Sequence, residues 1–213
     1  MLISKKYITF AKELIKNINK ILIMEENKNK ILLVIDAQYD FINGSLAVNG
    51  AEEKMLKLAD FINKNGSKYK MIILTADWHP INHMSFIVNG GTWPTHCVQH
   101  TVGAAIYQPI VEASFNNTTT IVLTKGDIST VEEYSIMDNY HSSKKVLFHL
   151  DKDDVEQVDV CGIANEYCVL ETVKSLNEKF KLGCKLNILS EFVAQISEDK
   201  LSAYAEENNI KMV

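Results

Sequence analysis

The chain has 213 residues, 46% of them hydrophobic and 23% charged, a balance that fits one globular domain with a sizeable core. Its formal net charge of −5 argues against nucleic acid as a partner, and its 22 basic residues are all lysine, which excludes an arginine clamp on phosphate. Four cysteines without a CxxC pair argue against a disulfide scaffold and favour a reducing, cytoplasmic location. No apolar run reaches the length of a membrane span.

The N-terminal part of the chain is predicted to lie outside the main domain. Residues 3–24 have the spacing of an amphipathic helix, and a polar linker follows over 25–30. We expect the apolar stripe of this helix to pack on the domain or on a second subunit. The second case would make the protein a homo-oligomer. A mitochondrial presequence and a lipid-surface helix are alternatives, although Glu13 and the lack of arginine disfavour the first. Residues 31–213 are predicted to form a single domain.

Apolar runs alternate with amphipathic segments through the rest of the chain. The predicted strands cover residues 31–35, 71–76, 120–124, 155–161, 185–189 and 210–213. The predicted helices cover 51–63, a segment with Asn165 as N-cap that stops at 182–183, and 197–207 with Ser197 as N-cap. This alternation predicts an α/β fold of three layers (α/β/α), with a central, mainly parallel sheet.

Reactive side chains follow several of the predicted strands. Asp36, Asp77, Lys125 and the turn 162–168 each come directly after an apolar run. Because ligands of such sheets sit outside the carboxyl ends of the strands, we expect these groups to converge on one crevice. The segment 76–103 has little regular pattern and holds both tryptophans and four of the six histidines, and a loop of that length is usually functional.

Cys168 is the predicted nucleophile of this crevice. It lies in the first turn of a predicted helix, where unpaired backbone N–H groups and the helix dipole favour a thiolate and can bind an oxyanion. Taken alone, a free cysteine is more often a small buried hydrophobe. Asp36 could accept the thiol proton if burial raises its pKa, and Lys125 would offset the remaining negative charge. Taken alone, an aspartate such as Asp36 more often caps a helix or turn at a strand end, and a lysine such as Lys125 is more often a solvated surface charge.

A divalent metal site is predicted beside this nucleophile. Asp77 and His79 point the same way on an extended segment, and His96 can return from the far side of the loop. One carboxylate and two imidazoles with open positions suit Zn²⁺, Fe²⁺ or Mn²⁺. His83 is a weaker candidate. Several side chains could supply apolar walls for an aromatic ring, namely Phe41, Leu46, Trp93, Tyr134 and Tyr167.

Several motifs together resemble the nicotinamidases of the isochorismatase-like cysteine hydrolase superfamily, which also hydrolyse pyrazinamide. The resemblance runs from about residue 31 to the C-terminus. It is carried by VIDAQYDF (34–41), GSLAV (44–48), TADWHP (75–80), TWPTHCV (92–98), TKG (124–126) and GIANEYCV (162–169). The resemblance implies an isochorismatase-like fold and hydrolysis of nicotinamide to nicotinate and ammonia, through a cysteine thioester, in NAD salvage.

The resemblance also implies roles for individual residues. Asp36, Lys125 and Cys168 would be the catalytic triad, and the N–H groups of Ala164 and Cys168 would form the oxyanion hole, next to a cis peptide between residues 163 and 164. One divalent metal ion, zinc before iron or manganese, would be held by Asp77, His79 and His96, with Ser85 as a fourth position. The pyridine ring would lie between Phe41 and Trp93, with its nitrogen toward the metal.

Two other functions stay open on the sequence. The first is an amidohydrolase of the same fold that acts on a ureide or carbamoyl substrate, although such an enzyme would not need the Asp77, His79 and His96 set. The second is a catalytically silent scaffold that binds a partner through the N-terminal helix. The complete set of Asp36, Lys125 and Cys168 argues against that scaffold.

Overall fold

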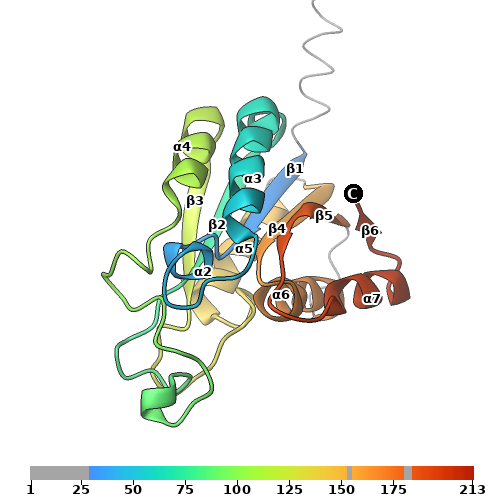
Figure 1. Cartoon of the computed structure of the whole chain (residues 1–213). Coiled ribbons are helices and arrows are strands. Elements are labelled where there is room, and N and C mark those ends of the chain that lie inside the picture. Colours follow the sequence, from blue (N-terminus) through green and yellow to red (C-terminus); the bar gives the residue numbers. More distant parts are fainter. Residues whose placement is uncertain (1–28, 153–154, 180–183) are drawn as a thin grey trace, which may run out of the picture.

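The computed structural model describes residues 29–152, 155–179 and 184–213. A six-stranded, all-parallel sheet forms the centre, in the order β3-β2-β1-β4-β5-β6 (Figure 1). Its strands are β1 (Lys30–Ile35), β2 (Met71–Asp77), β3 (Thr120–Lys125), β4 (Gln157–Ile163), β5 (Lys185–Ala194) and β6 (Lys211–Met212). The predicted helix over 3–24 and the predicted helix stop at 182–183 lie outside the described residues, so both stay predictions.

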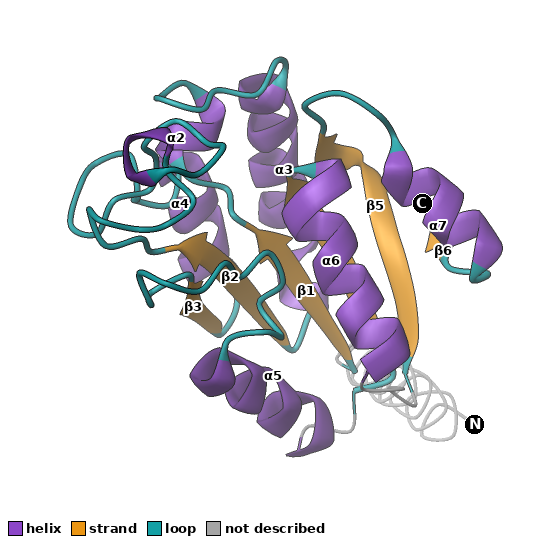
Figure 2. Ribbon diagram, turned by 90° about the horizontal axis from the view of Figure 1, so that it is seen from below, coloured by secondary structure: helices purple, strands orange, loops and turns teal. Residues whose placement is uncertain are grey.

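Helices cover both faces of the sheet and form the outer layers. They are α2 (Tyr39–Ile42), α3 (Ala51–Asn65), α4 (Gln108–Asn117), α5 (Tyr140–Lys152), α6 (Leu170–Lys174) and α7 (Lys200–Glu207). Figure 2 shows α3 and α4 on one face and α5 and α6 on the other. The predicted three-layer α/β/α fold is therefore confirmed. Short 3₁₀ turns cover Gly66–Lys68 and Ile87–Asn89, and π-helical turns cover Asn165–Val169 and Ser175–Lys179.

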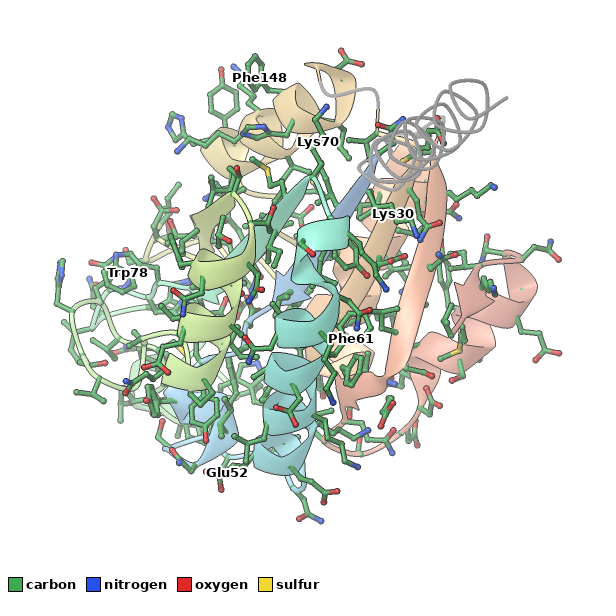
Figure 3. All side chains as sticks on the ribbon, turned by 90° about the horizontal axis from the view of Figure 1, so that it is seen from above. Lys30, Glu52, Phe61, Lys70, Trp78 and Phe148 are labelled. Atoms are coloured by element: carbon green, nitrogen blue, oxygen red, sulfur yellow. The ribbon has the colours of Figure 1, made fainter. Side chains whose placement is uncertain are left out.

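Strand β1 is a continuous apolar run from Ile31 to Ile35, because helices cover both of its faces. Strand β1 lies between β2 and β4, and its residues from Ile31 to Ile35 are at most 1% exposed. On the α3 face, Phe61 lies on the side of the helix toward β5 (Figure 3), with its ring centroid 5.1 Å from that of Phe192. Burial of this kind stabilises the fold by about 25 cal/mol for each Å² of apolar surface.

The strand register brings the predicted reactive residues to one edge of the sheet. Asp77 at the end of β2 pairs with Lys125 at the end of β3. Ile35 at the end of β1 pairs with Gly162 near the end of β4, which places Asp36 beside the turn that leads to Cys168. Parallel strands share the direction of their carboxyl ends, so residues far apart in sequence meet there.

Close packing of β4 against β1 requires glycine at position 162. Gly162 has φ of +122°, and a Cβ atom there would lie 2.0 Å from the carbonyl oxygen of Ile35. We expect Gly162→Ala to lower the free energy of unfolding by about 2–4 kcal/mol, from backbone strain and overpacking together. Gly50→Ala is the matched control, because Gly50 also has positive φ but has nothing within 4 Å of the added atom. Urea unfolding of both variants measures the difference, and equal losses would contradict the packing argument.

Two predicted helix caps are wrong. The turn that carries Cys168 starts at Asn165 itself, and the Asn165 side chain instead accepts a hydrogen bond from the Leu201 N–H (3.2 Å). Helix α7 is capped by Asp199, whose carboxylate accepts from the Ser202 N–H (3.0 Å), whereas the Ser197 hydroxyl donates to Glu166 (3.0 Å). In both cases the side chain binds a residue that is distant in sequence, and not a backbone N–H group in the first turn of the following helix, as a capping residue would.

Helices α4 and α5 and the short helix α2 were missed by the sequence analysis. Helix α4 has a weak apolar stripe, with only three buried positions, and α5 presents mostly polar side chains. Within the described part of the chain, no helix combines the length and the apolar character needed to cross a bilayer.

Candidate active site

Three buried side chains from three strand ends meet at the carboxyl edge of the sheet. Asp36 follows β1, Lys125 ends β3, and Cys168 lies in the turn after β4. The Lys125 Nζ atom lies 2.9 Å from Asp36 Oδ2 and 3.4 Å from Cys168 Sγ. Asp36 and Lys125 are 0% exposed and Cys168 is 7% exposed. The structure thus brings together the three residues that the sequence analysis proposed as a triad.

The Asp36 backbone is held in an uncommon conformation. Its φ is +47°, in the left-handed region, which costs an ordinary residue about 1 kcal/mol. The Thr75 hydroxyl donates to Asp36 Oδ1 (2.6 Å) and accepts from the Asp36 N–H (3.2 Å). Such strain is tolerated where the surrounding structure determines the conformation, and here it turns the carboxyl group toward the lysine.

Burial and charge set the protonation states of this group. Burial raises the pKa of Asp36, although Lys125 opposes the rise. Burial likewise raises the pKa of the Cys168 thiol well above its ordinary value, against the effect of Lys125. For Lys125 burial would lower the pKa, but the facing carboxyl groups of Asp36 and Asp77 hold it well above the usual range. Burial raises both pKa values, that of the thiol from a higher ordinary value, so an Asp36 carboxylate stabilised by Lys125 can accept the proton of the neutral Cys168 thiol.

Asp77 lies between the lysine and two histidines. Its Oδ1 atom accepts a hydrogen bond from Lys125, a contact that the sequence analysis did not predict. Its Oδ2 atom lies 3.5 Å from His79 Nε2 and 3.9 Å from His96 Nε2. Burial would raise the pKa of Asp77, but Lys125 and His79 lower it overall. Asp77 is therefore an ionised carboxylate, the form that binds a metal ion.

The donor atoms of Asp77, His79 and His96 all lie within 4.8 Å of one another. The Nδ1 atom of His79 lies 3.0 Å from the Gly126 carbonyl, and that of His96 lies 2.7 Å from the Pro94 carbonyl. A carbonyl oxygen only accepts, so each Nδ1 carries the proton and each Nε2 lone pair is left to face Asp77. Backbone partners of this kind orient metal-binding histidines, and the donor set fits a divalent cation.

His83 and Ser85 lie next to this cluster and bind each other. The Nε2 atom of His83 lies 2.9 Å from the Val131 carbonyl and must donate, so Nδ1 accepts from the Ser85 hydroxyl (2.7 Å). The His83 ring lies against that of His79, with centroids 4.2 Å apart. Both His83 nitrogens therefore bind protein groups, which supports its lower rank as a ligand. Ser85 as a fourth metal position stays a prediction.

A pocket opens beside Cys168. All five predicted wall residues line it, namely Phe41, Leu46, Trp93, Tyr134 and Tyr167. The Trp93 indole N–H donates to the Tyr134 hydroxyl (3.0 Å), and the Trp93 and Tyr167 rings meet edge to face at 4.9 Å. These contacts fix a largely aromatic wall, which suits a flat, ring-shaped ligand.

The peptide bond between Ile163 and Ala164 is cis, as the resemblance implies. Ala164 lines the pocket together with Cys168, and its carbonyl accepts from the N–H groups of Tyr167 and Val169, both at 3.1 Å. The chain therefore turns sharply just before the cysteine, which brings the backbone of Ala164 to the pocket. The oxyanion-hole role of its N–H group stays a prediction.

The sequence analysis missed three residues of the site. Glu132 and Ile196 line the pocket, and burial raises the pKa of Glu132. Gln38 is fully buried and binds the backbone of Asp77 on both sides, with Nε2 to the carbonyl and Oε1 to the N–H, each at 2.8 Å. Gln38 lies in the first motif of the chain, and Ile196 follows the end of β5. The strand-end rule could therefore have pointed to both.

Comparisons with known proteins agree with this geometry. Residues 30–208 match the isochorismatase domain family. The chain is 30% identical to the nicotinamidase of Saccharomyces cerevisiae, over 86% of this chain and 99% of that protein. Its fold is similar to that of PnC1 from L. infantum in complex with nicotinate, at 27% identity over 88% of this chain and 93% of the other, with a TM-score of 0.75.

A third comparison concerns a metal-bound protein. The pyrazinamidase of Pyrococcus horikoshii, solved in complex with zinc, is 31% identical, with coverage of 87% of this chain and 98% of the other and a TM-score of 0.69. The likeness extends across the described sheet and helices rather than one motif. The chain therefore belongs to the isochorismatase domain family, and the curated relatives that it matches over most of its length include the nicotinamidases of Saccharomyces cerevisiae and Escherichia coli.

Proposed function

We propose that this protein hydrolyses nicotinamide to nicotinate and ammonia through a thioester on Cys168. One observation carries the proposal: Cys168, Asp36 and Lys125 meet at an aromatic pocket that Asp77 and His96 also line. A flat ring fits the aromatic walls, and an amide carbon that enters this pocket would come next to the sulfur. NAD salvage is the usual role of this reaction and is the role that we propose here.

The first half of the reaction forms the thioester. Asp36 takes the proton of Cys168 as the sulfur attacks the amide carbon, and the electron pair of the C=O bond moves to oxygen. Backbone N–H groups of Ala164 and Cys168 are proposed to bind that oxyanion, each donor being worth about 3 kcal/mol. When the C–N bond breaks, Asp36 returns the proton to nitrogen and ammonia leaves. Lys125 remains charged throughout and stabilises the carboxylate form of Asp36.

The second half uses the same groups for water. Asp36 takes a proton from a water molecule as its oxygen attacks the thioester carbon, and the C–S bond then breaks. The sulfur regains a proton from Asp36, so that the triad returns to its starting state and nicotinate carries the new oxygen. The raised pKa of Asp36 suits this exchange, because it makes the carboxylate a stronger base toward the thiol and water.

A divalent cation fits Asp77, His79 and His96, and zinc is the proposed ion before iron or manganese. When bound, it would act as a Lewis acid that holds the pyridine nitrogen. Asp77 would contribute a negative charge to the ion, and the carbonyl groups of Gly126 and Pro94 orient the imidazoles of His79 and His96. Ser85 is the proposed fourth position.

The test is the reaction itself. Purified, metal-loaded protein should release ammonia and nicotinate from nicotinamide in equal amounts, followed by a coupled ammonia assay and by chromatography. Benzamide, which has the same amide but no ring nitrogen, should react far more slowly. Absence of nicotinate would overturn the proposal, and faster turnover of an N-carbamoyl amino acid would favour the ureide or carbamoyl alternative.

Metal content offers a further prediction that does not depend on turnover. Loss of one imidazole should weaken metal binding by a factor of about 10–100 or more, so His96→Ala should retain less than one ion per chain after gel filtration. His100→Ala is the matched control, because His100 is exposed and its ring contacts only the edge of Trp78 among the contacts described, at 5.1 Å. Plasma mass spectrometry measures both. Equal metal content in the two variants would place the ion elsewhere.

A further inference from the structure

The loop between β5 and α7 is bound directly to the turn that carries Cys168. That turn supplies two adjacent polar side chains, Asn165 and Glu166, and both bind the segment 196–201 rather than their own helix. In Figure 2, helix α7 lies next to β5, and it also contacts α6. The nucleophile and this loop are therefore parts of one hydrogen-bonded unit.

Glu166 makes most of these bonds. Its side chain is buried, and its carboxylate accepts from the Ile196 N–H (3.1 and 3.2 Å), the Ser197 N–H and the Ser197 hydroxyl (3.0 Å). Burial of a carboxylate is costly unless several donors satisfy it. All of these donors come from two consecutive loop residues, so this one side chain holds the start of the loop.

Asn165 makes a second connection to the same segment. Its side-chain oxygen accepts from the Leu201 N–H (3.2 Å), and its amide donates to Asp199 (2.9 Å), which in turn caps α7. The start of α7 is therefore held to the turn as well, and the loop is fixed at both of its ends.

These bonds place Ile196 at the pocket. Its side chain lines the pocket together with Cys168 and Ala164, yet it is 43% exposed, so it lies at the mouth rather than at the base. The Ile196 N–H binds Glu166, which is only two residues before Cys168. Glu166 therefore holds the Ile196 backbone close to the turn that carries the sulfur.

We propose that Ile196 is a specificity-determining residue that limits how large a ring the pocket accepts, and that Glu166 is the positioning residue that holds it there. This inference rests on the proposed function. A single-ring amide fits beneath Ile196, whereas a fused second ring that extends to the mouth would collide with it. Removal of the side chain, or of the carboxylate that holds the loop, should admit the larger ring.

The first experiment compares nicotinamide with the two-ring amide quinoline-3-carboxamide on the metal-loaded enzyme. Ile196→Ala should raise the ratio of kcat/KM for the two-ring amide to that for nicotinamide by about tenfold or more, the size of effect that a few methylene groups give in an apolar pocket. Most of the change should lie in KM, because Ile196 does not touch the reacting atoms. A ratio equal to that of the wild type would overturn the specificity role.

The second experiment tests Glu166. Glu166→Ala should raise the same ratio, Glu166→Gln should raise it less because one acceptor oxygen remains, and the Ile196→Ala/Glu166→Ala double variant should match Ile196→Ala alone. Glu171→Ala is the control, since Glu171 is part-exposed on α6 and pairs with Lys174. A merely structural role would lower both rates equally and leave the ratio unchanged, and that outcome would overturn the positioning role.

A binding measurement keeps this inference separate from the proposed reaction. In the Cys168→Ala background, calorimetry gives the Kd values of both amides without turnover, and the same variants should shift the Kd ratio in the same direction. If the wild-type protein fails to hydrolyse nicotinamide but the variants still shift the Kd ratio, the proposed reaction is refuted and the specificity role is retained. If the wild type hydrolyses nicotinamide but the variants leave the Kd ratio unchanged, the specificity role is refuted and the reaction is retained.

Discussion

Cys168→Ala is expected to lower kcat for nicotinamide by about 10⁵-fold, which is the scale of losing a catalytic nucleophile. The sulfur is the group placed 3.4 Å from Lys125 in the pocket, and alanine offers nothing that can form a covalent intermediate. Nicotinamide binding should persist, because the aromatic walls are unchanged. Ammonia release under single-turnover conditions, with calorimetry for binding, measures both effects.

The matched control for this variant is Cys161→Ala. Cys161 is also buried, but it lies within β4, with its sulfur 4.0 Å from the Leu33 carbonyl. It should keep kcat within about twofold while it loses about 1 kcal/mol of stability from the deleted sulfur. Comparable loss of activity in both variants would mean that Cys168 acts through packing alone, and the nucleophile assignment would fail.

Lys125→Met should remove activity and also destabilise the fold. Lys125 is fully buried and pairs with two buried carboxyl groups, those of Asp36 and Asp77. Loss of one partner from a buried ion pair typically costs about 3–5 kcal/mol, because the remaining charges are left without compensation. Chemical unfolding of the metal-free proteins measures the loss of stability. A variant as stable as the wild type would show that the lysine charge does not offset the carboxylates.

The loss should also depend on pH. The pKa of Asp36 is already raised in the folded protein, and removal of the lysine charge raises it further. A group with a raised pKa in the folded state favours folding at low pH, and this contribution is lost as the pH rises above its unfolded value of 3.8. Because the two proteins share the same unfolded pKa, the stability deficit of Lys125→Met relative to the wild type should grow as the pH rises above the folded-state pKa of Asp36 in the wild type.

The control for the lysine variant is Lys57→Met. Lys57 pairs with Glu53 at 2.9 Å on the surface of α3, where both side chains are more than half exposed. Water screens such a pair, so its removal should leave both the unfolding midpoint and the turnover of nicotinamide unchanged. If Lys125→Met loses the same free energy of unfolding at every pH, ionisation of the unpaired Asp36 carboxyl group cannot explain the loss.

Local sequence determined the strands and much of the site. Continuous apolar runs such as 31–35 and 71–76 are readable because a strand buried on both faces must be apolar at every position. Asp36, Asp77 and Lys125 come directly after such runs, and the parallel register brings them together. Of the five wall residues of the pocket, Phe41, Leu46, Trp93 and Tyr167 lie within the motifs quoted above, whereas Tyr134 lies outside them.

Only the tertiary structure decided which side chains bind distant partners. Asn165 and Ser197 are good helix caps by composition, but each finds a better partner about 30 residues away in sequence, which no local pattern encodes. The contact of Lys125 with Asp77 depends on the register of β3 against β2, and the place of Ile196 at the pocket mouth depends on how the loop after β5 packs. The strand ends could be predicted from the sequence, because a buried strand is an apolar run that ends where polar residues begin. The hydrogen bonds of the loops could not be predicted, because they join residues that are far apart in sequence and meet only in the folded chain.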